Sequence, residues 1–358
     1  MPKRYLSETV FANARARAQQ SPEGKAAEAA LREAAEKALS TEPHSVRDNG
    51  GSPYFRVDAV YVGGQDGVVN EEGNRESSGL AKRTGQRAVD LAMAYRYFGE
   101  ERYAEHALRL IHTWCINENT YMFPGGHVED AWNHGAIYGG DICVLTGFRD
   151  LFFATYLLDD YPGWDLRPHA AVWRWIRRMV DAQRPLKFFQ GVEMYNNWED
   201  ERLLYLALGA LALHDLELLD YVFTRWGEIL PMKMTDEGEL PRETHRTRSM
   251  TYSLMALHAS AHVAEIAHAH GFDLFNLTVN GKSLKLAVDY VTRYLLDLES
   301  WPHQMIHPLR PGDSLGGRLA LFEMAHTQWG DPAYLEVINS YGGRPVTGEH
   351  ATLLQLGM

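Results

Sequence analysis

Apolar residues recur at intervals of three and four along most of the chain, which is the spacing of an amphipathic α-helix. The clearest segments are AAEAALREAAEKALS, GQRAVDLAMAYRYFG, ERYAEHALRLIHTWC, ERLLYLALGALALHD and MTYSLMALHASAHVAEIAHAHG. No convincing run alternates apolar and polar residues as a half-buried strand does. The pattern therefore predicts an all-α protein.

Short polar or glycine-containing breaks separate consecutive helical segments, and an aromatic residue opens the next helix. The breaks occur in YRYFGEERYAEHALRLI, LALHDLELLDYVFTRW and AHTQWGDPAYLEVI, and a looser version spans AHAHGFDLFNL and KSLKLAVDYVTRYL. They predict successive helical hairpins, although the repeat has no strict period. Hairpins stacked around a ring form an (α/α) toroid, and an irregular helical bundle is the alternative.

Three long polar or glycine-rich segments, roughly 41–79, 116–140 and 231–246, separate the helices. Segments of this length in a compact domain are usually functional or disordered. The glycines of the first segment predict a mobile lid over residues 62–79. No shift in composition marks a boundary, so we expect a single domain over residues 1–358, with an N-terminal helical segment over 1–40.

The chain of 358 residues carries a formal net charge of −12. This charge argues against general binding to nucleic acid or to a membrane surface, which usually requires a basic face. An anionic partner must therefore meet a local basic patch. We find neither a secretory signal nor an apolar run long enough to cross a bilayer, and we expect a cytoplasmic protein. Cys115 and Cys143 lie in apolar helical runs, which favours buried thiols over a disulfide or a metal site.

A local basic patch occurs in RETHRTRSMTYS, residues 242 to 253. A helix predicted from about Thr247 places Arg248 one turn before Tyr252, and a helix that extends backward places His245 two turns before it. Nearby cations lower the pKa of a phenol, which is near 10 in water. Tyr252 could then remove a carbon-bound proton and return one to a departing oxygen. The alternative is a half-buried core tyrosine beside a solvated helix start.

The segment GVEMYNNWEDERLLYL places two asparagines, Asn196 and Asn197, directly before a predicted helix. Asparagine is a common N-cap residue, which gives this pair a structural interpretation. A side-chain amide can equally donate hydrogen bonds to a carboxylate or to a developing enolate.

The order of these elements resembles the alginate-lyase superfamily, polysaccharide lyases with an incomplete (α/α) toroid that cleave uronate polymers by β-elimination. The resemblance covers about residues 40 to 340 and rests on SPYFRVDAVYV, AYRYFGEERYAEHALRLIHTW, NTYMFPGG, YNNWED and GELPRETHRTRSMTYS. It implies that Tyr252 is the base and acid, and that Asn197 helps to neutralise the substrate carboxylate.

The chain departs from the pattern of this superfamily at two positions. Trp198 stands where alginate lyases have a histidine after the two asparagines, and His245 stands where they have an arginine. An indole can neither act as a base nor neutralise a carboxylate. The resemblance therefore supports the fold more strongly than the substrate. Because a related group of the superfamily acts on glucuronan, we expect a polyuronate other than alginate.

β-Elimination requires the uronate carboxylate to be neutralised, because the C5 proton is otherwise too weakly acidic. Arg246 or Arg248 could supply the charge, since a guanidinium fork matches two carboxylate oxygens. The segment GGHVEDAWNHGAIYGG offers His127 or His134 to replace the missing imidazole, of which we favour His134, and His245 competes for that role. The spacing of these histidines matches no standard zinc pattern, so we expect no metal or cofactor.

The leading hypothesis is a metal-independent lyase that acts on a 4-linked uronate in an anionic poly- or oligosaccharide. The candidate catalytic residues are Tyr252, Asn197, His134, His127, His245 and Arg248, and the candidate substrate-binding residues are Asn196, Trp198, Arg246, Arg242, Trp132, Tyr138 and Tyr195. One alternative is a toroid glycoside hydrolase acting on unsaturated uronyl oligosaccharides through carboxylic acids. Its candidate acids are Glu193, Glu199, Asp200 and Glu201. Another alternative is a sugar-binding homologue without activity.

Overall fold

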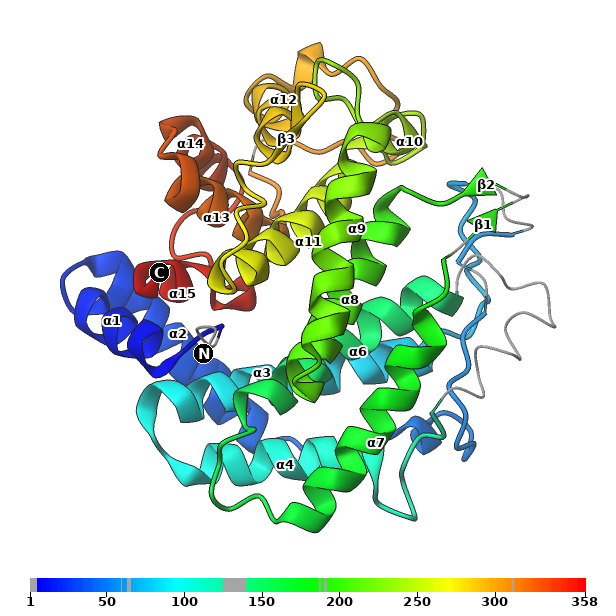
Figure 1. The fold of residues 1–358 in the computed structure, drawn as a ribbon, viewed down its shortest axis with the longest axis vertical. Coiled ribbons are helices and arrows are strands. Elements are labelled where there is room, and N and C mark those ends of the chain that lie inside the picture. Colours follow the sequence, from blue (N-terminus) through cyan, green and yellow to red (C-terminus); the bar gives the residue numbers. More distant parts are fainter. Residues whose placement is uncertain are drawn as a thin grey trace. The chain divides into compact units, whose positions relative to one another are not determined.

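The computed structural model describes residues 5–58, 60–62, 66–124, 140–186, 188–189, 192–310 and 312–358. These residues form α-helices joined by turns and by longer irregular segments, together with two very small sheets (Figure 1). The predicted all-α class is confirmed.

The helices follow one another along the whole described chain. They are α1 (Glu8–Ala18), α2 (Pro22–Leu39), α3 (Glu76–Phe98), α4 (Glu101–Cys115), α6 (Gly140–Leu157), α7 (Leu166–Gln183), α8 (Asn197–Leu213), α9 (Leu216–Lys233), α10 (Pro241–Thr244), α11 (Ser249–Ala269), α12 (Leu284–Leu296), α13 (Ala320–Trp329), α14 (Pro332–Ser340) and α15 (Ala351–Gly357). Short 3₁₀ helices are η1 (Val46–Asp48), η3 (Leu298–Ser300), η4 (Gly316–Leu319) and η5 (Gly348–His350). The paired strands are β1 (Phe188–Phe189) with β2 (Val192–Glu193), and β3 (Thr278–Val279) with β4 (Lys282–Ser283).

Two of the predicted breaks are glycine C-caps. Gly99 ends α3 with a φ of 77° and Gly330 ends α13 with a φ of 70°, the left-handed conformation that glycine adopts at little cost. After the second break, the Asp331 side chain accepts a hydrogen bond of 2.9 Å from the backbone N–H of Ala333 and caps α14. The helical hairpins predicted at these positions are confirmed.

The other two breaks use different chemistry. Between α8 and α9, His214 has a φ of 51°, and the Asp215 side chain accepts a hydrogen bond of 2.9 Å from the Leu218 N–H. Between α11 and α12, strands β3 and β4 form an antiparallel hairpin with Asn280 and Gly281 at the turn, both at positive φ. Asn-Gly is a favoured two-residue hairpin turn. The sequence pattern did not predict this hairpin.

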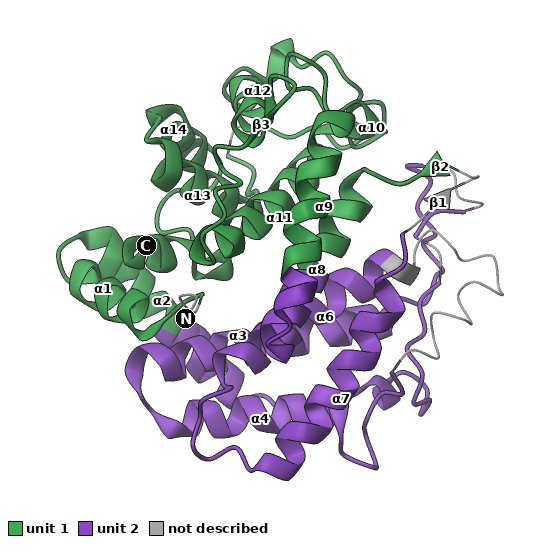
Figure 2. Cartoon of the chain, in the orientation of Figure 1, with its two compact units in different colours: residues 1–31, 189–204, 220–358 green, residues 32–188, 205–219 purple. Residues whose placement is uncertain are grey.

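The chain forms two compact units (Figure 2). Residues 1–31, 189–204 and 220–358 make up unit 1, and residues 32–188 and 205–219 make up unit 2. Within unit 1, α1 packs on α15 and α11 packs on α12 and α13; within unit 2, α3 packs on α4 and α6. The single domain expected from composition stays a prediction. Of the predicted lid, residues 76–79 form the first turn of α3.

Both cysteines, Cys115 and Cys143, are buried free thiols, as the sequence predicts. Burial raises the pKa of the Cys115 thiol well above its usual value, so this thiol stays protonated at neutral pH. Every helix in the described part of the chain is too short or too polar to cross a lipid bilayer.

A substitution at Gly238, in the turn between α9 and α10, tests the local packing of unit 1. The φ of Gly238 is +92°, and an added Cβ would lie 2.4 Å from the backbone oxygen of Leu286. Gly281 has a similar φ of +77° but open space at the Cβ position. We expect Gly281→Ala to lower the free energy of unfolding by about 1–2 kcal/mol, the cost of a left-handed alanine. Gly238→Ala should cost clearly more, because a backbone atom must also move. Equal losses in denaturant unfolding would contradict this packing.

Candidate functional site

The basic segment before Tyr252 forms a helical turn, a break and a second helix. Pro241 occupies the first position of α10, where its missing N–H costs nothing. Arg248 then adopts φ −116° and ψ 50° as the residue before α11, and it pairs with Met305 in an isolated β-bridge. The helix predicted from about Thr247 begins at Ser249, and it does not extend back to His245, because the backbone at Arg248 is not helical.

Tyr252 lies half-buried in the first turn of α11 and is covered by Arg246. The guanidinium carbon of Arg246 is 3.6 Å from the centroid of the Tyr252 ring, well within the range of a cation–π contact. The Arg248 Nε is buried and has no hydrogen-bond partner within the described residues. The cation observed on the Tyr252 ring is Arg246. The sequence analysis placed Arg248 and His245 before Tyr252 on the helix, and their roles stay predictions.

Asn196 and Asn197 have different environments at the start of α8. The Asn196 side-chain oxygen accepts a hydrogen bond of 3.3 Å from the Trp198 N–H, and the Asn196 carbonyl accepts from Glu199, so Asn196 caps the helix. Asn197 is only 2% exposed, and its Nδ2 donates to the Met255 sulfur at 3.4 Å. The Asn197 Oδ1 is buried without a hydrogen-bond partner in the part of the chain that the structure describes.

An incompletely satisfied buried amide costs about 1–3 kcal/mol, and such groups in native proteins call for an explanation. Asn197 therefore differs from an ordinary capping residue. Its amide is held beside α11, one helical turn after Tyr252, where Met255 provides only a weak sulfur acceptor.

Glu243 is a site residue that the sequence analysis missed. It is 1% exposed, its Oε1 accepts a hydrogen bond of 2.5 Å from the Asn197 backbone N–H, and its Oε2 has no hydrogen-bond partner among the described residues. Burial raises the pKa of Glu243 to about 8, although the Asn197 N–H and the charge of Arg246 act in the opposite direction. Glu243 is therefore mostly protonated at neutral pH. Its only sequence signal is an acid within a basic segment.

Four residues, Tyr252, Arg246, Glu243 and Asn197, form what we call the Tyr252 cluster. Besides the contacts above, the Arg246 backbone N–H donates to the Glu243 carbonyl at 3.1 Å, which sets the spacing between α10 and the turn. All four belong to unit 1. The cluster combines a phenol, an adjacent guanidinium and a buried amide, groups that can transfer a proton and bind an anion.

A second aromatic–arginine contact lies near the cluster in sequence. The guanidinium carbon of Arg242 is 3.6 Å from the ring centroid of Tyr195, and Arg242 donates to the Glu193 carbonyl at 2.9 Å. Both residues are half-buried, whereas Trp198 is only 8% exposed. Contact of these three residues with a sugar stays a prediction.

The predicted histidines are only partly described. The His245 side chain is 72% exposed, and its Nε2 lies 3.9 Å from Glu239 Oε1. His127 and His134, together with Trp132 and Tyr138, lie outside the described residues. Their predicted roles stay predictions.

The carboxylates at the start of α8 lie in a buried ion-pair network. Glu199 accepts two hydrogen bonds of 2.7 Å from Arg202, and Asp200 pairs with Lys233. Glu199, Asp200 and Glu201 are each at most 2% exposed. Glu193, which is more exposed, pairs with Arg225. Three of the four candidate acids of a hydrolase are thus shielded from solvent.

Comparisons with known proteins agree with this fold. The family described as alginate lyase matches residues 13–301. An alginate lyase from Bacteroides ovatus superposes with a TM-score of 0.78 at 20% identity, covering 98% of both chains. Alginate lyase A1-III from Sphingomonas species A1 gives 0.66 at 18% identity, and its complex with a tetrasaccharide gives 0.69 at 17%; both cover 92% of this chain and 93% of theirs. These matches confirm the predicted (α/α)-toroid fold class. No curated protein matches the chain.

The raised pKa of Glu243 predicts how the free energy of unfolding depends on pH. Between its usual value of 4.5 and about 8, the folded state binds a proton that the unfolded state releases, so the free energy of unfolding falls as pH rises through this window. The loss has an upper limit of about 5 kcal/mol. Glu243→Gln removes this titration, so its unfolding free energy should fall less steeply between about pH 5 and pH 9 than that of the wild type. Exposed Glu237→Gln is the control. Parallel curves for all three proteins in denaturant unfolding would show that Glu243 is ionised in the fold.

Proposed function

Because this chain belongs to the alginate lyase family, we propose that it is a polysaccharide lyase that cleaves a 4-linked uronate by β-elimination, with Tyr252 as base and acid. The observation that carries the proposal is the Arg246 guanidinium on the face of Tyr252, together with the buried Asn197 amide, which contacts Met255 one helical turn after Tyr252. The family supports the reaction class. The cluster supports the assignment of residues.

In the proposed reaction, the Tyr252 phenolate removes the proton on C5, next to the uronate carboxylate. The electron pair of the C5–H bond forms the C4–C5 double bond as the bond from C4 to the linking oxygen breaks. The phenol formed in the first step then returns its proton to that oxygen. The products are an unsaturated uronate end and a free hydroxyl on the leaving sugar, and no external reactant is consumed.

Arg246 has two proposed roles in this step, one at Tyr252 and one at the substrate carboxylate. Its positive charge favours the phenolate over the neutral phenol. A guanidinium can also donate two parallel hydrogen bonds to the substrate carboxylate, which stabilises the negative charge that develops there. Arg248 is the second candidate for this contact, since its Nε has no hydrogen-bond partner within the described residues.

The side-chain amide of Asn197 is proposed to donate a hydrogen bond to the same carboxylate. A carboxylate oxygen is a much better acceptor than the thioether sulfur that the Nδ2 meets now. Because Asn197 is only 2% exposed, the residues that cover it must move when substrate binds. Glu243 then acts as a positioning residue that holds the Asn197 backbone and, being neutral, does not repel the substrate.

The substrate class is proposed from chemistry and from the relatives. Alginate lyase A1-III binds a tetrasaccharide, and an anionic oligosaccharide suits the arginines around Tyr252. With Trp198 in place of the histidine, we propose a uronate other than alginate, with glucuronan as the first candidate. His127 or His134 remains the proposed source of the imidazole, and no metal ion takes part in the chemical step.

The glycoside hydrolase alternative requires a carboxylic acid that reaches the glycosidic oxygen. Burial and ion pairing of Glu199 and Asp200 count against those two residues. A sugar-binding homologue without activity would keep the Tyr252 cluster and bind the sugar without cleaving it. The three functions differ in their products.

A panel of polyuronates and their oligomers tests the function directly. We expect glucuronan, or another 4-linked uronate among alginate blocks and hyaluronan, to give ultraviolet absorbance from the new double bond. Hydrated reducing ends without this absorbance would show hydrolysis instead. Binding without turnover across the panel would identify a sugar-binding protein.

The role of Tyr252 is tested by Tyr252→Phe, which keeps the ring under Arg246 and removes only the oxygen. We expect kcat to fall by roughly 100- to 10,000-fold, the usual contribution of a general acid–base group, with circular dichroism unchanged. Tyr294→Phe is the matched control, because Tyr294 is a half-buried tyrosine on α12 that also contacts an arginine. A Tyr252→Phe variant as active as Tyr294→Phe would refute the assignment.

A further inference from the structure

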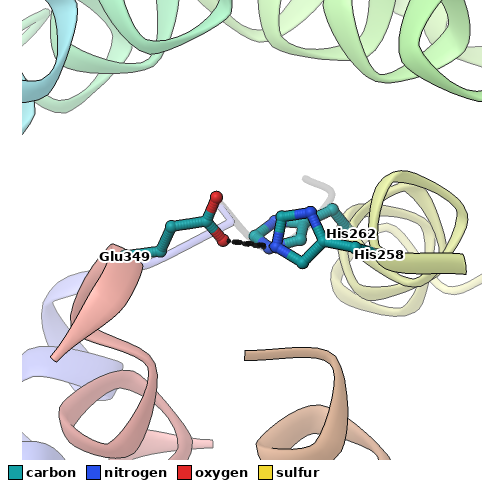
Figure 3. A group of neighbouring side chains, drawn as sticks. All are labelled: His258, His262 and Glu349. Atoms are coloured by element: carbon teal, nitrogen blue, oxygen red, sulfur yellow. Dashed lines mark hydrogen bonds and ion pairs between the residues drawn. The ribbon is translucent and has the colours of Figure 1, made fainter. Parts of the chain in front are cut away.

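His258, His262 and Glu349 lie together, and none of them belongs to the Tyr252 cluster (Figure 3). His258 and His262 are four residues apart on α11, so their rings lie on one helix face. Glu349 Oε2 lies 2.9 Å from the His258 Nε2 and 2.7 Å from the His262 Nε2. The three potential ligand atoms lie within 4.8 Å of one another.

We propose that His258, His262 and Glu349 bind a divalent transition-metal ion, with Zn²⁺ as the fitting ion. Two imidazole nitrogens and one carboxylate oxygen are a ligand set that zinc accepts, and three protein ligands leave a fourth position for water. All three residues belong to unit 1. This site goes beyond the proposed elimination, which uses none of its residues.

The spacing of the ligand atoms is close to that of a metal site. Zinc bonds of about 2.0–2.1 Å in a tetrahedron place neighbouring ligand atoms about 3.4 Å apart. The observed separations of 2.9 and 2.7 Å are those of hydrogen bonds, so each contact must lengthen by roughly half an ångström to admit the ion. Small rotations of the imidazole rings about their side-chain bonds provide a movement of this size.

The backbone around Glu349 is held in an unusual conformation. Glu349 and His350 both have positive φ, 56° and 53°, which is uncommon for residues other than glycine. Such conformations persist only when surrounding structure enforces them, and they occur often at ligand sites. Gly348, just before them, packs so closely that an added Cβ would lie 2.6 Å from the Gly317 Cα. The turn is thereby fixed against η4, with the Glu349 carboxylate directed at the histidines.

The three proposed ligands are not sealed from solvent. The exposed fractions of the side chains are 6% for His258, 19% for His262 and 25% for Glu349, which leaves the cluster partly accessible to an ion.

A metal ion here would join α11 to the turn before α15. Glu349, in this turn, is 91 residues from His258 in the chain. The alternative role of the same residues is a hydrogen-bonded ion pair without metal. The two roles differ in whether the purified protein binds Zn²⁺ stoichiometrically through these side chains.

The test uses the full chain, treated with a chelator, dialysed and titrated with Zn²⁺ alone in a calorimeter. We expect one equivalent to bind, and we expect His262→Ala and Glu349→Gln to weaken binding by at least about tenfold, because each removes one of three ligands. His268→Ala is the matched control, since His268 is an exposed histidine on the same helix. Ca²⁺, which prefers oxygen ligands, should bind much more weakly.

Thermal unfolding provides a second measurement. Zn²⁺ at a hundredfold excess over the dissociation constant of the wild type should raise the Tm of the wild type by on the order of 5 °C, and it should raise the Tm of His262→Ala by at most about half as much. His262→Gln replaces His262→Ala if the latter does not fold. Absence of stoichiometric binding, or equal binding by the wild type and both ligand variants, would overturn the site. Neither measurement uses a sugar, so a failed metal site and a failed lyase assignment are distinguishable.

Discussion

The hydrogen bond from the Asn197 backbone N–H to the Glu243 carboxyl joins the start of α8 to the single turn of α10, and the candidate site is arranged around it. From Glu243, one turn of chain leads to Arg246, whose guanidinium covers Tyr252. From Asn197, the side-chain amide reaches Met255, one helical turn beyond Tyr252. The Glu243 carboxyl thus joins α8 to α10, and the contacts of Asn197 with Met255 and of Arg246 with Tyr252 join them to α11.

The electrostatics follow from burial more than from the number of charges. The chain as a whole is acidic, yet the acid in the Tyr252 cluster is neutral at pH 7, because burial raises the pKa of Glu243 to about 8. Nearby carboxylates at the start of α8 are matched by buried cations, as in the pair of Asp200 with Lys233. The charge of Arg246 is thus not cancelled by an ionised Glu243. Separating the partners of a buried ion pair is costly. The pair of Asp200 with Lys233 therefore also holds the start of α8 in place.

The sequence predicted the features that local rules determine. Helical periodicity and glycine caps located the helices and their breaks, as at Gly99 and Gly330, because these depend on neighbouring residues alone. The break before α11 was missed, since Arg248 is held out of the helix by pairing with Met305, 57 positions later. Glu243 and Glu349 were missed for the same reason. Their roles depend on long-range contacts that no local pattern encodes. The roles proposed for Tyr252 and Asn197 came from family resemblance, and the structure adds contacts of both residues.

The most direct measurement of the central claim is a crystal structure of the Tyr252→Phe variant with a uronate tetrasaccharide bound. The mechanism predicts one uronate carboxylate within hydrogen-bond distance of the Asn197 side-chain amide and of the Arg246 or Arg248 guanidinium. It also predicts C5 of that sugar within about 3.5 Å of the position that the tyrosine oxygen occupies in the wild type. A sugar bound with its carboxylate away from Asn197 and the arginines, or with C5 out of reach of residue 252, would contradict the proposed chemistry.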